Sequence, residues 1–197
     1  MTETPPGFPR EGLGLLLDQL ARDGWLVGLN TDVDPALARM DSTTGVYNRA
    51  YHEDLVQEAI ADARADRPRL LDGPERGRVA VITIRVADWE RVLLDRGEDI
   101  RGHLETEIAR RLASCLRAED SLARTACDTF TLLLRGCAAE QLEGIAERCA
   151  AVVGEPPIVT PAGPVRLAAI TATTDWEGED PTDFLARAQT DITSALH

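Results

Sequence analysis

The sequence predicts an α/β protein, a three-layer sandwich in which a mixed central sheet is flanked by helices, with a short N-terminal helical arm. Three observations predict this fold class. The run 79–84 (VAVITI) is continuously apolar and β-branched, as is typical of a strand buried on both faces. The segments 121–126 and 130–135 read as two strands of a tight hairpin near the centre of the sheet. Apolar residues recur at helical spacing around them, so the core order is α-β-α-α-β-β-α-β-α.

Residues 1–40 are predicted to form an arm, and residues 41–197 a domain. The first twelve residues are rich in Pro and Gly and are expected to be disordered. Leucines at 13, 16, 17 and 20 then predict a short amphipathic helix, 25–30 a strand, and Asp34-Pro35 the start of a helical turn. This arm is too short for a domain, so we expect a packing or dimerisation element.

The domain is predicted to begin with a polar turn, 41–49, that leads into a helix. The apolar stripe of this helix is Tyr51, Leu55, Ala59 and Ala63. After a loop at 67–77 and the strand 79–84, a helix starts near Asp88 and breaks around Gly97. A longer helix follows, whose apolar stripe is Leu104, Ile108, Leu112 and Leu116. Its Arg110-Arg111 pair is more typical of a solvent-exposed face than of a phosphate clamp.

The C-terminal part of the domain contributes the hairpin and three further elements. Cys127, Asp128 and Thr129 separate the two hairpin strands. A helical stripe runs from Leu142 to Val153, the run 165–172 predicts a strand, and 181–196 predicts the last helix.

Composition excludes several classes of function. The 197 residues include 34 acidic and 21 basic side chains, a net charge of −13, which disfavours binding to nucleic acid or to an anionic membrane surface. All the basic residues are Arg, so chemistry that needs a lysine amine is excluded from the side chains. No apolar run approaches the roughly 20 residues of a membrane helix, and the N-terminus lacks the basic start of a secretory signal. We therefore expect a cytoplasmic protein.

The four cysteines indicate neither a zinc site nor a disulfide framework. Cys115, Cys127, Cys137 and Cys149 form no CxxC pair, and the chain has three histidines. Cys115 and Cys149 lie on apolar helical stripes and are predicted to be core residues with reduced thiols. No metal site and no cofactor are predicted.

Three stretches carry a resemblance to the GGDEF family, the domain of bacterial diguanylate cyclases. DSTTGVYNR (41–49) resembles the family's DxLTGLxNR motif, 109–112 with 116–124 resembles its long helix and the following strand, and TACDTF (125–130) stands where the family has xGGDEF. The resemblance spans Asp41 to the C-terminus. It implies the family's fold and, in its active members, the joining of two GTP molecules into cyclic di-GMP with the help of carboxylate-bound divalent metal.

At the catalytic positions the chain departs from the family pattern. The metal-binding Asp at the end of the first strand aligns with Arg85, whose guanidinium would repel Mg²⁺. The two glycines become Ala126 and Cys127, which add side chains where backbone should approach the phosphates. Asp128 keeps the first acidic position of the motif and Thr129 replaces the second. Compared with the family motif, the hairpin sequence of this chain, ACDTF (126–130), thus lacks the set of residues that active members use for catalysis.

The positions that contact the nucleotide also differ. The family's guanine-binding Asn and Asp align with Leu93 and Gly102, which cannot hydrogen-bond a guanine edge. Its FK dipeptide becomes Trp89-Glu90, and the Lys of its last helix becomes Leu196.

Arg117 and Asp120 retain the RxxD of the family's inhibitory site. There the resemblance implies that the Arg contacts a phosphate or guanine of cyclic di-GMP and that the Asp accepts from the guanine edge. A structural role is the alternative, because an Arg at a helix end complements the helix dipole and Asp120 can cap the following turn.

We therefore expect a non-enzymatic GGDEF-like signalling module. It would act as a cyclic di-GMP receptor through Arg117 and Asp120, or as a regulatory domain that binds a protein partner or forms a homodimer. The alternative is a scaffold for protein interaction or dimerisation with no nucleotide ligand. A distant third hypothesis is residual nucleotidyl transfer, which would need Asp128 and a second carboxylate, with Asp88 nearest in sequence.

Overall fold

The computed structural model describes residues 37–65 and 78–195 of the chain. It divides into two units, Met1–Ala38 and Arg39–His197, and every described α-helix and β-strand belongs to the second. A 3₁₀ turn, η1 (Leu37–Arg39), lies at the boundary. The elements predicted within 1–36 and the loop predicted at 67–77 fall outside the described residues, so the role expected of the arm stays a prediction.

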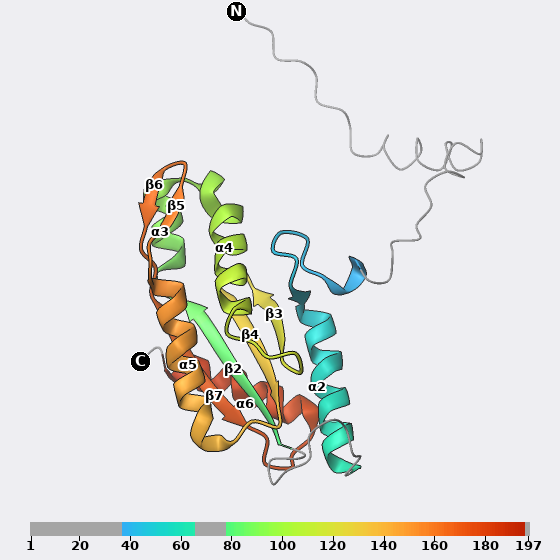
Figure 1. The fold of residues 1–197 in the computed structure, drawn as a ribbon. Helices are drawn as coiled ribbons and strands as arrows, with labels where there is room; N and C mark the ends of the chain where they lie inside the picture. The colour runs from blue at the N-terminus through green and yellow to red at the C-terminus, as the bar shows by residue number, and fades with distance from the viewer. Residues whose placement is uncertain (1–36, 66–77, 196–197) are drawn as a thin grey trace, which may run out of the picture. The chain divides into compact units, whose positions relative to one another are not determined.

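A five-stranded mixed sheet forms the middle layer (Figure 1). The first pair of strands is parallel and the other pairs are antiparallel. The sheet order is β1 (Tyr47–Asn48), β3 (Ser121–Ala126), β4 (Thr129–Arg135), β2 (Val79–Val86) and β7 (Ala169–Asp175). The β3–β4 hairpin therefore contributes the central strand, as predicted, and the mixed sheet is confirmed.

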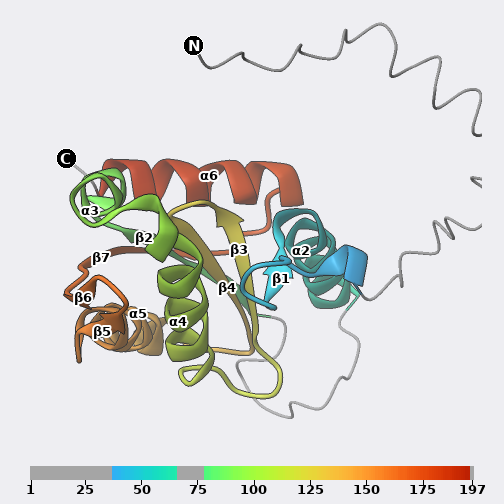
Figure 2. The same ribbon diagram turned by 90° about the horizontal axis from the view of Figure 1, so that it is seen from above.

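Helices cover both faces of this sheet (Figure 2). On one face lie α2 (Arg49–Arg64) and α6 (Pro181–Ser194). On the other lie α4 (Arg101–Ala113) and α5 (Ala139–Gly154), and the apolar side chains of the short α3 (Trp89–Arg96) join the same core. A 3₁₀ turn, η2 (Glu98–Ile100), connects α3 to α4. The predicted three-layer sandwich is confirmed.

Alternation along β2 separates two hydrophobic cores. Ile82 and Ile84 point into the larger core, under α4 and α5, whereas Val79 and Val81 point into the smaller core, under α2 and α6. Because successive residues of a strand face opposite sides, an apolar residue at nearly every position is what a strand between two helical layers requires. Seven of the eight residues of β2 are buried.

The buried face of α2 differs from the apolar stripe that the sequence predicts for this helix. The helix begins after Asn48, whose Oδ1 accepts a hydrogen bond from the Tyr51 N–H at 3.0 Å, but its fully buried residues are His52, Val56, Ala59 and Ile60. Leu55 and Ala63 pack at the margin of the core. The prediction followed the aromatic ring of Tyr51, which is only half-buried, and so placed the buried face about one residue away.

The strand predicted at 165–172 is wrong in its bounds. Two short strands, β5 (Ile158–Thr160) and β6 (Gly163–Val165), pair as a separate hairpin, and β7 starts only at Ala169. Val165 and Leu167 are buried in the larger core and so imitate the alternation of a sheet strand. Leu116 was predicted to lie on the apolar stripe of the longer helix. It packs against the larger core, but it lies beyond the end of α4.

Arg110 and Arg111 lie in different environments, the first on the surface and the second in the interior. Arg110 is exposed, as expected, but the side chain of Arg111 is 8% exposed, and its Nη1 donates to the carbonyl oxygens of Val152 and Val153 at 3.1 and 3.3 Å. These are carbonyls of the last turn of α5, where a cation is favourable to the helix dipole. Arg111 therefore joins α4 to α5.

No helix in the described ranges is both long and apolar enough to cross a membrane.

Candidate functional site

The tip of the central hairpin lies against the end of β2. Cys127 and Asp128 form the turn between β3 and β4, and the Val86 N–H donates to the Asp128 carbonyl at 2.8 Å. Thr129, predicted to be in the turn, is the first residue of β4, and its hydroxyl donates to Asp128 Oδ1 at 2.8 Å. Ala126 and Cys127 are exposed at this tip, so both add side chains there.

An ion pair joins the hairpin tip to β2. Arg85 Nε lies 2.8 Å from Asp128 Oδ2, with the two side chains 40% and 14% exposed. A divalent cation prefers oxygen ligands, but Arg85 presents a guanidinium to the one carboxylate here. These residues do not fit a Mg²⁺ ion, because the cation that neutralises Asp128 is already part of the chain.

Asp88 contributes no second carboxylate to this pair. Its side chain is 64% exposed and accepts a hydrogen bond from Arg91 at 3.3 Å. Within residues 37–65 and 78–195, no three His, Cys, Asp or Glu side chains are grouped as metal ligands would be.

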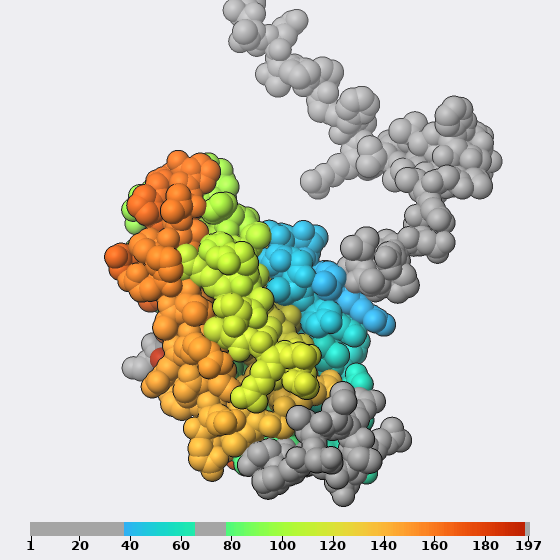
Figure 3. Space-filling view, viewed as in Figure 1, coloured from blue at the N-terminus to red at the C-terminus, as the bar shows by residue number. Residues whose placement is uncertain are grey.

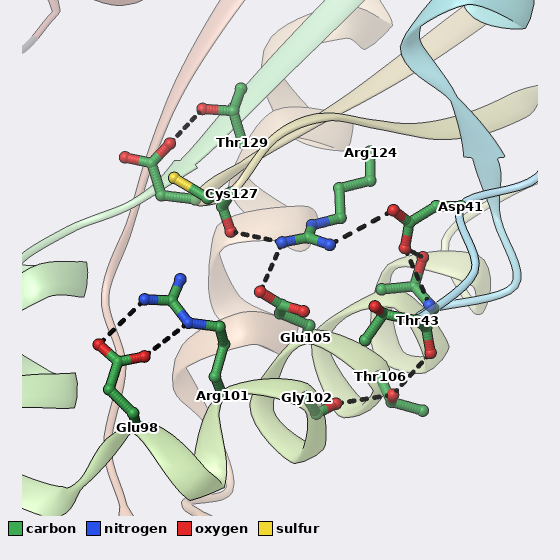
Figure 4. A network of polar contacts seen from close by, with 12 residues as sticks. Asp41, Thr43, Glu98, Arg101, Gly102, Glu105, Thr106, Arg124, Cys127 and Thr129 are labelled. Atoms are coloured by element: carbon green, nitrogen blue, oxygen red, sulfur yellow. Dashed lines mark hydrogen bonds and ion pairs between the residues drawn. The ribbon is translucent and has the colours of Figure 1, made fainter. Parts of the chain in front are cut away.

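A buried polar network lies on the other side of the hairpin (Figure 4). Arg124 is its centre: its guanidinium contacts Asp41 Oδ2 at 3.3 Å, Glu105 Oε1 at 2.5 Å and the Cys127 carbonyl at 3.3 Å. The side chain of Glu105 is only 3% exposed. Burial raises the pKa of Glu105, and the opposing attraction of Arg124 only partly offsets it.

The same network fixes the turn that begins at Asp41. The backbone N–H and the hydroxyl of Thr44 both donate to Asp41 Oδ1, at 2.9 and 2.7 Å. Burial works to raise the pKa of Asp41, but these hydrogen bonds and Arg124 outweigh it, so the net pKa is lowered. Thr106 of α4 donates to the Thr43 carbonyl at 3.2 Å. The turn, α4 and β3 are thereby held together.

Among the described residues, the positions that align with the family's nucleotide contacts do not come together as a polar pocket. Leu93 and Trp89 are 1% and 3% exposed and belong to the larger core. Gly102 lies inside α4, where an added Cβ would meet the Thr43 side chain at 3.6 Å. Glu90 is exposed on α3, and Leu196 lies outside the described residues.

Arg117 and Asp120 lie in the turn that follows α4. This turn is part of the surface that Figure 3 shows in yellow-green. Arg117 is exposed, and Asp120 is half-buried. The Asp120 carboxylate accepts from the Arg117 backbone N–H at 3.0 Å, so it caps this turn. Burial raises the pKa of Asp120 against the opposing effect of that hydrogen bond. The two residues therefore lie in one turn, and the backbone of Arg117 and of Arg135 already hydrogen-bonds the Asp120 carboxylate.

His52 is a site residue that the sequence reasoning missed. Its side chain lies on the buried face of α2 and lines a cavity that reaches the Arg85–Asp128 pair. Its spacing from Val56 and Ile60, four and eight residues on, would have placed it on the buried stripe.

The domain is thus a mixed sheet between helical layers, with an acidic residue at the tip of the central hairpin. Residues 38–197 match the family described as "Diguanylate cyclase, GGDEF domain". The chain belongs to the GGDEF family.

The chain is similar to several known proteins. The uncharacterized protein YhcK of Bacillus subtilis is 29% identical over 122 residues, which cover 62% of this chain and 32% of YhcK. The chain thus spans about a third of that relative. The GGDEF domain of DgcB from Caulobacter crescentus, solved in complex with c-di-GMP, has a TM-score of 0.71 at 13% identity, covering 81% of this chain and 88% of that domain. The diguanylate cyclase SiaD from Pseudomonas aeruginosa, solved with its activator SiaC, has a TM-score of 0.70 at 20% identity, covering 94% of this chain and 70% of SiaD.

Proposed function

We propose that this chain is a regulatory GGDEF domain that does not synthesise cyclic di-GMP and that binds cyclic di-GMP through Arg117 and Asp120. The Arg85–Asp128 ion pair is the observation that carries the first half of the proposal. Phosphoryl transfer depends on positioning and on neutralising charge, and metal held by carboxylates supplies much of the latter in this chemistry. Here the carboxylate of the hairpin tip is already neutralised by an arginine at 2.8 Å.

The turn after α4 supports the second half. Arg117 is exposed, and a guanidinium fork suits both a phosphate and the O6/N7 edge of guanine. Asp120 stands beside it, fixed by its hydrogen bond to the Arg117 backbone. A structural relative, the DgcB domain, is solved with c-di-GMP.

The test of binding is a calorimetric titration of the whole chain with cyclic di-GMP. Arg117→Ala should abolish the binding while leaving the melting temperature without ligand unchanged. Arg110→Ala is the matched control, because Arg110 is also exposed, on the preceding helix, and is paired with Glu107. At a hundred times the dissociation constant, ligand should stabilise the wild-type fold by about 2.7 kcal/mol. Equal binding by wild type and Arg117→Ala would overturn this assignment.

The test of catalysis is incubation with GTP and Mg²⁺, followed by chromatography for cyclic di-GMP. We expect no product from the wild type and none from Asp128→Asn. If the wild type forms product and Asp128→Asn does not, the chain is a residual cyclase and the first half of the proposal is wrong.

One observation favours a second candidate, a protein-interaction domain without a nucleotide ligand. Asp120 already caps the turn through the Arg117 N–H, which is the structural role that such a motif has without any ligand. Under this alternative the titration gives no heat, and the function depends on a partner or on a second copy of the chain. The titration therefore separates the two candidates.

A further inference from the structure

Two of the four cysteine side chains contact each other inside the larger core. Cys149 lies on the buried face of α5, and Cys115 lies in the turn that follows α4. The two thiols share a hydrogen bond, and both residues belong to the same hydrophobic cluster. Both cysteines are free in this structure. Two reduced thiols in contact are the starting arrangement for a disulfide, because that bond needs the two side chains close together and directed at each other.

The packing of α4 against α5 brings these cysteines together. Arg111 Nη1, near the end of α4, donates to the Val153 carbonyl at 3.3 Å, and Arg148 Nη2 donates to the Cys115 carbonyl at 3.2 Å. Numbers thus rise along one segment as they fall along the other, so the two segments run in opposite directions. Cys115 follows Arg111 by four residues, and Cys149 precedes Val153 by four. The cysteines therefore occupy matching positions, one helical turn from the Arg111 contact.

The turn after α4 keeps Cys115 buried but close to the surface. The N–H groups of Ser114, Cys115 and Leu116 donate to the carbonyls three residues earlier, at 3.1, 2.9 and 3.3 Å. Such bonds tighten the last turn of a helix. Residues 113–114 and 117–119, on either side, are exposed. Cys115 is 8% exposed and Cys149 0%, so Cys115 is the thiol of this pair that a small solute can reach.

The surroundings of Cys149 also assign different parts to the two thiols. Burial raises the pKa of Cys149, and the neighbouring Cys115 side chain raises it further. Cys149 therefore keeps its proton. Because the thiolate is the nucleophile in thiol chemistry, Cys115 is the cysteine of the pair that reacts first. A more accessible cysteine beside a second one that resolves its oxidised form is a common arrangement in redox-sensitive proteins.

We propose that Cys115 and Cys149 are an oxidation site, at which a peroxide converts the two thiols into a disulfide between the turn after α4 and α5. The Cys115 sulfur attacks one oxygen of hydrogen peroxide, the O–O bond breaks, and the released hydroxide leaves with the Cys115 proton as water. The Cys149 sulfur then attacks the sulfur of the Cys115 sulfenic acid, the S–O bond breaks, and a second hydroxide leaves with the Cys149 proton as water. The two sulfur atoms together lose two electrons, which the peroxide gains.

The disulfide would tie a surface turn to the core. Arg117 and Asp120 lie in this turn, directly after Cys115. In the reduced chain the hydrogen bond from Arg148 to the Cys115 carbonyl joins the turn to α5, and the disulfide adds a covalent link at the same place. Oxidation should therefore restrict the motion of the turn and stabilise the fold. This proposal does not depend on whether the turn binds cyclic di-GMP.

The experiment treats the whole folded chain with hydrogen peroxide, alkylates the remaining thiols and maps the tryptic peptides by mass spectrometry without reduction. Cleavage after arginine places each cysteine in its own peptide: Cys115 in 112–117, Cys127 in 125–135, Cys137 in 136–148 and Cys149 in 149–166. We expect 112–117 and 149–166 to be linked, with a mass two hydrogen atoms below their sum, and dithiothreitol to open the link. The oxidised chain should melt about 5 °C or more above the reduced chain.

Two variants provide the comparison. Cys149→Ala should abolish both the link and the rise in melting temperature, whereas Cys137→Ala, which also removes a buried thiol, should keep both. If Cys149→Ala fails to fold, the peptide map of the wild type still decides, because it needs no variant. The proposal is overturned if peroxide leaves the two thiols free to be alkylated, if it adds oxygen to Cys115 without forming the link, if Cys115 or Cys149 joins another cysteine instead, or if the linked chain melts below the reduced one.

Discussion

Arg124 connects three parts of the chain that are distant in sequence: the turn at Asp41, helix α4 and the hairpin. Its side chain is 13% exposed, and that of Glu105 is 3% exposed. Taking two charges out of water is costly, and the pair is tolerable only because each member neutralises the other. The main effect of the network is therefore to fix how the turn, α4 and the hairpin pack together. Its net contribution to stability is smaller.

The first prediction concerns this pair. Arg124→Ala should lower the free energy of unfolding by about 3–5 kcal/mol, because it leaves Glu105 buried and unpaired. The double variant Glu105→Leu with Arg124→Met should recover part of that loss, since it removes both charges of this pair and leaves only Asp41 without its ion pair. Urea unfolding at pH 7 measures both variants. A loss below about 1 kcal/mol in Arg124→Ala would contradict the buried pairing.

The second prediction concerns His52 and pH. Its pKa in the folded state is about 4, against 6.5 for an ordinary histidine. The unfolded chain therefore binds a proton at His52 between these pH values and the folded chain does not, so stability falls as the pH falls from about 6.5 to about 4. The shift corresponds to about 3 kcal/mol. Glu53, Arg49, Arg85 and Asp128 line the same cavity and remain in every variant.

Thermal or urea unfolding of the wild type and of His52→Gln over this pH range should show the effect as a difference between the two proteins. His52→Gln should lose less stability than the wild type between pH 6.5 and 4, because the carboxylates titrate alike in both proteins. His103→Gln should follow the wild type. Parallel stability curves for wild type and His52→Gln would show that His52 is protonated as easily in the folded state as in the unfolded chain.

At the scale of the element, helix α6 depends on its N-cap. Asp180 Oδ1 accepts a hydrogen bond from the Thr182 N–H at 3.0 Å, and Pro181 stands at the start of the helix, where its missing N–H costs nothing. The third prediction is that Asp180→Ala lowers the free energy of unfolding by about 1 kcal/mol. Asp180→Ser, which retains a capping oxygen, should restore most of it. Thermal unfolding of both variants provides the comparison.

Elements with long periodic patterns could be predicted from the sequence, and short elements could not. The strand β2 and the two strands of the hairpin lie where the pattern placed them, because their runs of apolar and β-branched residues identify a strand despite a few polar positions. β1 has two residues, and β5 and β6 have three each. Strands of that length carry no period, and Gly163-Pro164 reads as a loop, so only tertiary pairing defines them.

The candidate site was predictable only where it depended on the local sequence. The hairpin tip with Asp128 and the turn with Arg117 and Asp120 follow from spacing along the chain. The Arg85–Asp128 contact joins positions 43 residues apart, and the cavity around His52 joins α2, α6 and three strands. Such convergence is set by the sheet order, which local propensity does not encode.

At the scale of the whole molecule, the core that the described residues form lies in the second unit. Its two hydrophobic clusters are drawn from residues between Val46 and Ala188. The fourth prediction is that the chain from Arg39 to His197 folds alone, with a melting temperature within about 2 °C of that of the whole chain. Light scattering on both forms tests the role of the arm: a dimer that becomes monomeric on truncation would support dimerisation through residues 1–38. A truncated chain that fails to fold would contradict the division into two units.

The Arg85–Asp128 ion pair also makes the two positions depend on each other. Arg85→Asp alone would place two carboxylates side by side, which is costly without a cation between them. Loss of Asp128 alone would leave the arginine without its counterion. Substitutions at these two positions, 43 residues apart in the chain, should therefore not be additive, because the effect of each depends on the residue at the other.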